Sequence, residues 1–367
     1  MKLSALTKVA AIGGIAALTL TSCAANESAS GSTEGGAAAS SLSGNLIGAG
    51  ASSQGSAQEA WVAGFQTANP DVTVNYDPTG SGAGRETFQQ GASAFAGSDR
   101  AFKLEEIEAG PFDACAADSG IVEFPAYISP IALIFNVEGV DSLKLDAPTV
   151  AKIFSGEITS WDDAAIAAQN EGVTLPAQNI VAVHRSDKSG TTENFTDYLT
   201  AAAPAEWTPG AIEEWPTEFG GEAAQGTSGV VEAVANGVGT IGYADASRAG
   251  DLSTVEIKVG EEYVAYSPEA AAAIVDASPL EEGRGEHDLA VTIDRSTTEA
   301  GVYPIVLVSY LIGCEAYEDA ANAELAKAYF NYIVSAEGQD LAAESAGSAP
   351  ISDSLRSKIQ PAIDAIS

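Results

Sequence analysis

Histidine, cysteine and basic residues are all scarce in this chain of 367 residues. It has two histidines, three cysteines, and 16 lysines and arginines against 51 aspartates and glutamates, so its net charge at neutral pH is −35. A chain with so few cations lacks the basic surface on which nucleic acid condenses, and nucleic acid is therefore excluded as a partner.

The same scarcity limits enzyme and metal chemistry. A Ser-His-Asp triad would have to use His184 or His287, and His184 stands beside Arg185 where an apolar run ends, as expected at the end of a strand. No EF-hand spacing appears among the acids, and no Gly-Lys-Ser/Thr follows a glycine cluster, which excludes a Walker A loop. We expect the protein to have no enzymatic activity and to bind no metal or other cofactor. A secreted serine hydrolase is the alternative.

The N-terminal apolar segment, Val9 to Leu20, is shorter than the roughly 20 residues that a membrane-spanning helix needs. A small residue, Ser22, stands directly before Cys23, as in a bacterial lipobox. We predict a signal peptide over 1–22, lipidation of Cys23, and a flexible tether over 23–43 that is rich in Ala, Ser, Gly and Glu. An ordinary signal peptide with an incidental cysteine is the alternative.

Lipidation of Cys23 would leave Cys115 and Cys314. Two remaining cysteines in an exported protein pair more often than they stay free, so we expect a disulfide, although the sequence cannot show that they lie close together.

Three predicted strands each lead through a turn with small hydroxyl residues into a helical pattern. The turns contain Gly48–Ser53, Gly80–Gly84 and Ser189–Thr191. A helix start presents unpaired N–H groups and the positive end of the helix dipole, and glycine lets the backbone approach a ligand. With the charged fork of Arg185, these turns predict a socket for a tetrahedral oxyanion.

Asp99 follows a further short strand, and ligand groups gather at the carboxyl ends of parallel strands. Two other interpretations apply to the glycines. Gly48 and Gly50 loosely match a dinucleotide fingerprint whose third glycine is missing, and any one cluster taken alone could be a structural turn.

Two long apolar runs, 124–136 and 302–312, bracket the middle of the chain and predict crossover strands between two α/β lobes. We expect lobe one over 44–130 plus 304–367 and lobe two over 131–303, with a hinge between them. Amphipathic tail segments at 325–333 and 352–366 would return to lobe one.

Taken together and in this order, the motifs resemble the PstS family, the phosphate receptors of bacterial phosphate ABC importers. The resemblance covers residues 44–367 and includes Gly97-Ser98-Asp99, the segment from Ser155 to Asp163, and Arg185 to Thr192. It implies a two-lobe periplasmic-binding-protein fold of type II with hinge strands. It also implies a monomeric receptor on the outer face of the cell membrane, anchored by lipid such as palmitate at Cys23, that delivers phosphate to a permease.

Carried over residue by residue, the resemblance assigns a set of phosphate contacts. They are Ser52, Ser53, Ser81 and Asp99 from lobe one, and Arg185, Ser189, Gly190 and Thr191 from lobe two. Asp187, two residues from Arg185, would hold its guanidinium in place, with a solvated acid in a turn as the alternative. The chain departs from the family pattern at Ser53, where phenylalanine is common, and at Lys188, where glycine is usual.

A carboxylate beside a bound anion indicates a ligand that carries a proton. Asp99 can accept a hydrogen bond from a protonated phosphate, whereas fully ionised sulfate would set lone pair against lone pair. A receptor for another oxyanion, such as sulfate or molybdate, remains an alternative.

Overall fold

The computed structural model describes residues 42–367. The predicted signal peptide 1–22, Cys23 and nearly all of the tether 23–43 lie outside these residues. Within the described part of the chain, no helix is both long enough and apolar enough to cross a membrane.

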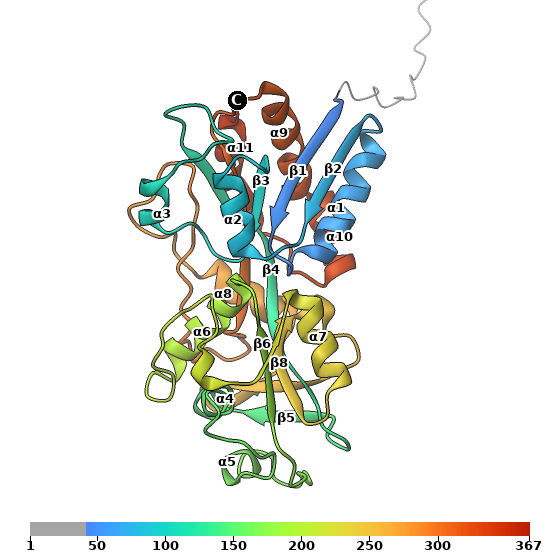
Figure 1. Cartoon of the computed structure of the whole chain (residues 1–367), viewed down its shortest axis with the longest axis vertical. Helices are drawn as coiled ribbons and strands as arrows, with labels where there is room; N and C mark the ends of the chain where they lie inside the picture. Colours follow the sequence, from blue (N-terminus) through green and yellow to red (C-terminus); the bar gives the residue numbers. More distant parts are fainter. Residues whose placement is uncertain (1–41) are drawn as a thin grey trace, which may run out of the picture. The chain divides into compact units, whose positions relative to one another are not determined.

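Strands and helices alternate along most of the chain, as expected for an α/β protein (Figure 1). The strands are β1 Gly44–Gly50, β2 Val72–Asp77, β3 Phe95–Ser98, β4 Ile121–Asn136, β5 Ser142–Leu145, β6 Val181–Arg185, β7 Glu222–Ala224, β8 Thr240–Asp245, β9 Ser253–Val259, β10 Glu262–Val264 and β11 Val306–Cys314. The α-helices are α1 Gly55–Ala68, α2 Ser81–Gln89, α3 Leu104–Ala109, α4 Ala147–Phe154, α5 Ala164–Ala167, α6 Gly190–Ala202, α7 Gly226–Asn236, α8 Pro268–Asp276, α9 Ala320–Val334, α10 Ala336–Ala346 and α11 Asp353–Ala365.

The first half of the sheet contains the strands in the order β2-β1-β3-β11. Strand β1 runs parallel to both β2 and β3, so the carboxyl ends of all three strands point the same way. Val72 and Val74 on β2 are buried while their neighbours are exposed, as in a strand with one buried face. Helix α1 buries Trp61 and Phe65, which recur at the helical period.

Strand β4 joins this half to the second half of the sheet. It pairs with β11 from Ile121 to Pro130, and with β8 from Ile131 to Asn136. Figure 1 shows this green strand continuing from one group of strands into the other. Pro125 lies where the register with β11 shifts, because proline has no N–H to contribute to a regular ladder.

The second half contains β8-β6-β7, together with β9 and its neighbours β5 and β10. Its core is aromatic: the rings of Phe195 and Tyr243 stack with centroids 4.5 Å apart, and Phe154 packs edge-on against Phe195 at 4.8 Å. These contacts fix helix α6 against β8 and so set the direction of the helix start.

In the C-terminal region the structure differs from the sequence-based expectation at two points, the start of β11 and helix α10. The second apolar run was expected to be extended from Val302, but strand β11 begins only at Val306, after Pro304. Helix α10 was not predicted. It begins one residue after α9, where Ser335 accepts a hydrogen bond from Gly338 N at 3.1 Å and caps the new helix.

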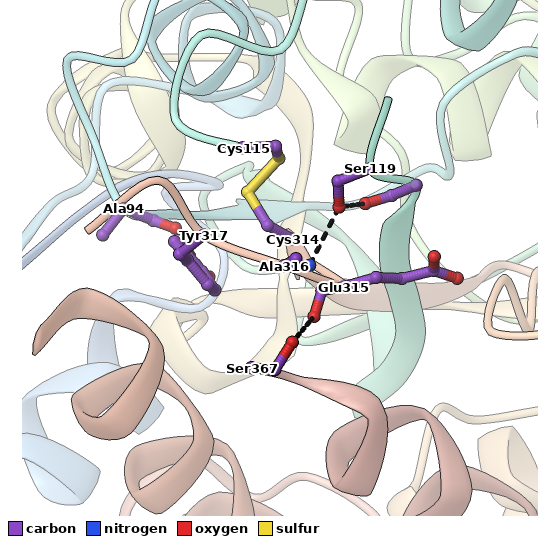
Figure 2. Close-up of a disulfide and its surroundings, with 9 residues drawn as sticks. Ala94, Cys115, Ser119, Cys314, Glu315, Ala316, Tyr317 and Ser367 are labelled. Atoms are coloured by element: carbon purple, nitrogen blue, oxygen red, sulfur yellow. Dashed lines mark hydrogen bonds between the residues drawn. A yellow bond between two sulfur atoms is a disulfide. The ribbon is translucent and has the colours of Figure 1, made fainter. Parts of the chain in front are cut away.

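Cys115 and Cys314 form the expected disulfide, which joins the segment after α3 to the end of β11 (Figure 2). Neighbouring hydrogen bonds tie the same two segments together, with Ala316 N donating to Ser119 Oγ at 2.8 Å.

Removal of this disulfide should destabilise the fold considerably, because the cysteines are 199 residues apart and the bond restricts a very large loop in the unfolded chain. We expect the double change Cys115→Ser and Cys314→Ser to lower the free energy of unfolding by about 2–4 kcal/mol. Urea denaturation of both proteins measures this. Equal midpoints and slopes would contradict the expectation, and reductant should affect only the parent protein.

Candidate functional site

The predicted first-half residues meet at one edge of the sheet. Ser52 and Ser53 follow β1, Ser81 begins α2, and Asp99 follows β3. Because β1, β2 and β3 are parallel, the loops that leave their carboxyl ends lie next to each other. Gly84 allows α2 to pack directly on β1, since a side chain there would lie 2.3 Å from the Gly50 Cα.

Asp99 is the centre of this arrangement and is only 2% exposed. Its Oδ1 accepts hydrogen bonds from Ser53 Oγ at 2.6 Å and Ser309 Oγ at 2.8 Å. Its Oδ2 accepts one from Thr191 Oγ1 at 2.8 Å, and its backbone N–H donates to Ser81 Oγ at 3.1 Å. Hydroxyl groups from both halves of the protein therefore converge on one carboxylate.

Burial raises the pKa of Asp99, and the three hydroxyl donors and Arg185 counteract that rise. Each donor stabilises the ionised carboxylate, because a hydroxyl hydrogen bonds more strongly to a charged oxygen than to a neutral one. The surroundings thus keep this buried carboxylate able to accept a hydrogen bond from a ligand.

Arg185 ends strand β6 and is buried. Its Nε donates to Asp187 Oδ1 at 2.7 Å and its Nη2 donates to Asp187 Oδ2, which forms a bidentate pair. Asp187 also accepts from Gly226 N at 3.0 Å. Burial opposes ionisation of Asp187, but the Arg185 contacts hold its pKa below the usual value.

Helix α6 begins at Gly190, as predicted, directly after Ser189. The Ser189 hydroxyl caps the helix by accepting a hydrogen bond from Thr192 N at 3.2 Å. A side chain at Gly190 would lie 2.8 Å from the Asp99 Cβ and 2.9 Å from Ser81 Oγ, so only glycine fits this contact between the two halves.

All eight residues predicted to contact the ligand lie at this junction, but Ser52 has a partner that was not predicted. Its hydroxyl accepts a hydrogen bond from Thr227 N at 3.1 Å, at the start of helix α7. The sequence carried a signal for this, since Gly226-Thr227-Ser228 is another glycine and hydroxyl helix start.

Ser309 was missed for a different reason. It lies in the apolar strand β11, where one hydroxyl gives no motif, yet it contacts Asp99 and accepts a hydrogen bond from Gln54 Nε2 at 2.6 Å. Only the antiparallel pairing of β11 with β3 brings it beside Asp99.

The two departures from the family pattern both make contacts across the site. Ser53 donates through its hydroxyl to Asp99, a contact that phenylalanine could not make. Lys188 accepts a hydrogen bond from Gly82 N at 3.2 Å through its backbone oxygen, and its Nζ lies 3.8 Å from Glu86 Oε1. The start of α6 keeps its capped geometry with lysine at this position.

The two histidines contact an aromatic ring and a carboxylate, respectively. His184 stacks on the Trp215 ring at a centroid distance of 5.0 Å, and burial lowers its pKa. His287 Nδ1 lies 2.7 Å from Glu315 Oε1. Among residues 42–367, no cluster of His, Cys, Asp and Glu could hold a metal ion.

A second buried carboxylate, Asp245, lies where β4 passes from β11 to β8, opposite Ile131. It accepts hydrogen bonds from Tyr127 OH at 3.1 Å and Ser247 N at 2.9 Å. Burial raises its pKa to about 6, with a further contribution from the charge of Asp99.

Asp245 should make stability depend on pH in a definite direction. Its raised pKa means that the folded state binds the proton more tightly than the unfolded state, so this stabilisation is present at low pH and is lost as pH rises through about 6. Relative to Asp245→Asn, the parent protein should lose about 2–3 kcal/mol of unfolding free energy between pH 4 and pH 7. Urea titrations of both proteins test this, and parallel pH profiles would contradict it.

Comparison with known proteins shows which family the chain belongs to. The chain matches the PBP superfamily domain over residues 34–337. The phosphate-binding protein PstS 3 of Mycobacterium leprae is 36% identical over 326 residues, which cover 88% of this chain and 86% of that protein. This chain belongs to the PstS family. Membership confirms the family that the motifs indicated. It also confirms the expectation of a binding protein rather than an enzyme.

Solved structures agree with the PstS fold. A phosphate-binding protein from Stenotrophomonas maltophilia has a TM-score of 0.66 and 20% identity, covering 87% of this chain and 94% of that one. A putative phosphate ABC transporter substrate-binding protein from Clostridium perfringens, solved with bound phosphate, has a TM-score of 0.58 and 22% identity, covering 83% and 98%. The predicted mixed α/β periplasmic-binding-protein fold is therefore confirmed.

Proposed function

We propose that this protein binds inorganic phosphate between the two halves of the sheet and delivers it to an ABC importer. The observation that carries the proposal is the convergence of hydroxyls from both halves on Asp99, beside the buried Arg185. Relatives named as phosphate-binding proteins support it.

Asp99 would give the site its selectivity. A carboxylate has about four acceptor positions, and Ser53, Ser309 and Thr191 use three of them. The fourth would accept the proton of HPO₄²⁻ or H₂PO₄⁻. Sulfate has no proton to give at neutral pH, so its oxygens would meet a desolvated negative charge.

The remaining contacts would be neutral donors and one cation. We assign Ser52, Ser53 and Ser81 to one side of phosphate, and Ser189, Gly190 and Thr191 to the other. Ser53 and Thr191 would contribute backbone N–H groups, because their hydroxyl protons are bonded to Asp99. Arg185 would use the edge of its guanidinium that faces away from Asp187.

Binding would close a hinge. We propose that residues 44–130 plus 304–367 form one lobe and 131–303 the other, with β4 among the hinge strands. The change of β4 partner between Pro130 and Ile131 supports this boundary. Rigid-body closure about a few strand residues is the usual motion of such receptors.

The receptor would act as a monomer outside the cell, held to the membrane by lipid on Cys23. Ser22 before Cys23 and the polar tether support this anchor. Incorporation of radiolabelled palmitate, compared between the parent and Cys23→Ser, tests it. Equal labelling of both proteins would contradict the anchor without affecting the binding site.

The function itself is tested by calorimetric titration of the purified protein with phosphate, sulfate and molybdate. We expect saturable one-to-one binding of phosphate and no competition from millimolar sulfate or molybdate. Preferred binding of another oxyanion would assign the receptor to that anion. Release of product from a chromogenic phosphate or ester would instead favour the secreted hydrolase.

A further inference from the structure

A cluster of ion pairs with Arg85 and Glu213 buried at its centre lies beside the Asp99 site and joins the two halves of the protein. Arg85 from α2 and Arg100 from the loop after β3 both reach Glu213, which belongs to the loop after α6. Arg85 Nη2 lies 2.5 Å from Glu213 Oε1, and Arg100 Nη2 lies 3.0 Å from Glu213 Oε2. Each oxygen of one carboxylate thus pairs with a guanidinium from the opposite half.

The charges are divided unequally between the two sides. The first half contributes the cations of Arg85, Arg100 and Lys103 and the carboxylate of Glu106, while the second half contributes Glu193 and Glu213. Each side alone therefore has two uncompensated charges, and the signs are opposite. Contact between the halves neutralises both sets.

Glu213 is ionised in this cluster. Burial opposes its charge, but Arg85 and Arg100 hold the pKa of Glu213 below the usual value. Arg85 is itself only 2% exposed, and its Nη1 donates a 2.7 Å hydrogen bond to Ser98 Oγ. A neutral residue at position 213 would remove the carboxylate that pairs directly with this buried guanidinium.

The cluster is connected to both sides of the proposed phosphate site. Ser98, which Arg85 contacts, and Arg100 directly precede and follow Asp99. Glu213 accepts a hydrogen bond from Ser189 N at 3.1 Å through its backbone oxygen, at the position that caps α6. The ion pairs are therefore joined directly to the proposed ligand groups on both sides of the site.

We propose that Glu213 is a positioning residue that holds the two halves closed over the ligand and thereby sets how slowly phosphate leaves; this rests on the phosphate-binding function proposed above. Glu213 touches no ligand atom in this account. Its carboxylate bridges Arg85 and Arg100 only when Asp99 and the start of α6 face each other. Closure thus gains a strong, short-range attraction in addition to the ligand's own contacts.

Stopped-flow measurement of phosphate binding and release by Glu213→Gln tests this role. Glutamine keeps the size of the side chain but removes its charge and replaces one of the two acceptor oxygens by an NH₂ donor. We expect the dissociation rate to rise about 10- to 100-fold, while the association rate changes by less than about threefold. Added salt should accelerate release from the parent protein more than from the variant.

Glu106→Gln is the matched control. Glu106 Oε2 pairs with the same Arg100 at 2.6 Å, but from the same half, so its charge does not hold the halves together. We expect the dissociation rate of this variant to stay within about threefold of the parent rate, which separates closure from the general environment of Arg100.

The outcomes separate the two proposals. If the parent binds phosphate and Glu213→Gln releases it at the parent rate, the positioning role is wrong and the function stands. An equal rise in dissociation rate for Glu106→Gln would also overturn the role, because it would show a local electrostatic effect. If the parent does not bind phosphate at all, both proposals fail. Should Glu213→Gln fold poorly, Arg85→Gln applies the same test from the opposite half.

Discussion

Arg185→Ala should weaken phosphate binding by about a thousandfold. The guanidinium is the only cation assigned to the ligand, and two charge-assisted hydrogen bonds to phosphate contribute about 1.5–3 kcal/mol each. At about 1.4 kcal/mol for each factor of ten, two such bonds correspond to roughly three orders of magnitude. Calorimetry, or competition binding if the affinity is too high for direct titration, measures the change.

Arg185→Lys is the informative companion variant. Lysine keeps the charge but loses the planar fork that pairs with Asp187, so affinity should recover only partly. Full recovery would show that phosphate needs charge alone at this position. An Arg185→Ala protein that is folded and binds phosphate with the parent affinity would remove Arg185 from the site.

Asp99→Asn should abolish most of the discrimination between phosphate and sulfate. Sites that require a hydrogen bond from the ligand reject analogues that lack it by factors of about 10⁴–10⁵, because a buried polar group is left unpaired. An asparagine amide carries no charge and can donate a hydrogen bond to a sulfate oxygen. We therefore expect the ratio of sulfate to phosphate dissociation constants to fall by about a thousandfold.

Asp187→Asn is the matched control for this selectivity. Asp187 is also an acid near the site, although only partly buried, and it contacts Arg185 and Gly226 rather than the assigned ligand position. Its substitution should reduce the affinity for both anions and leave their ratio nearly unchanged. Unaltered sulfate rejection by Asp99→Asn would disprove the role given to Asp99.

Lower pH provides a check on the same group without mutation. Because burial raises the pKa of Asp99, its carboxylate becomes protonated at higher pH than an exposed aspartate would. Sulfate binding to the parent protein should therefore strengthen as pH falls toward that pKa, and in Asp99→Asn it should not.

The sequence was most informative where a local rule decides the structure. The helix starts at Ser81 and Gly190 could be predicted because glycine, hydroxyl residues and a following apolar stripe are local features. The long apolar run of β4 likewise indicated a buried strand. Helix α10 was missed because it follows α9 after a single residue, without the glycine or proline that usually separates helices.

The candidate site was predictable only in part, for the same reason. Ser52, Ser81 and Asp99 lie in motifs, so their types and spacing could be interpreted. The position of Ser309 beside Asp99 depends on which strand lies next to β3. The contact of Glu213 with Arg85 depends on how a loop of the second half meets α2. Contacts between segments more than 100 residues apart follow from packing, which no local pattern in one sequence contains.

A crystal structure of the protein grown with phosphate tests the central claim most directly. We predict one phosphate between the halves, with one oxygen about 2.5–2.7 Å from an Asp99 carboxylate oxygen and others on Arg185 and the N–H groups that begin α2 and α6. Phosphate bound elsewhere, or bound here with no oxygen within hydrogen-bonding distance of Asp99, would contradict the account.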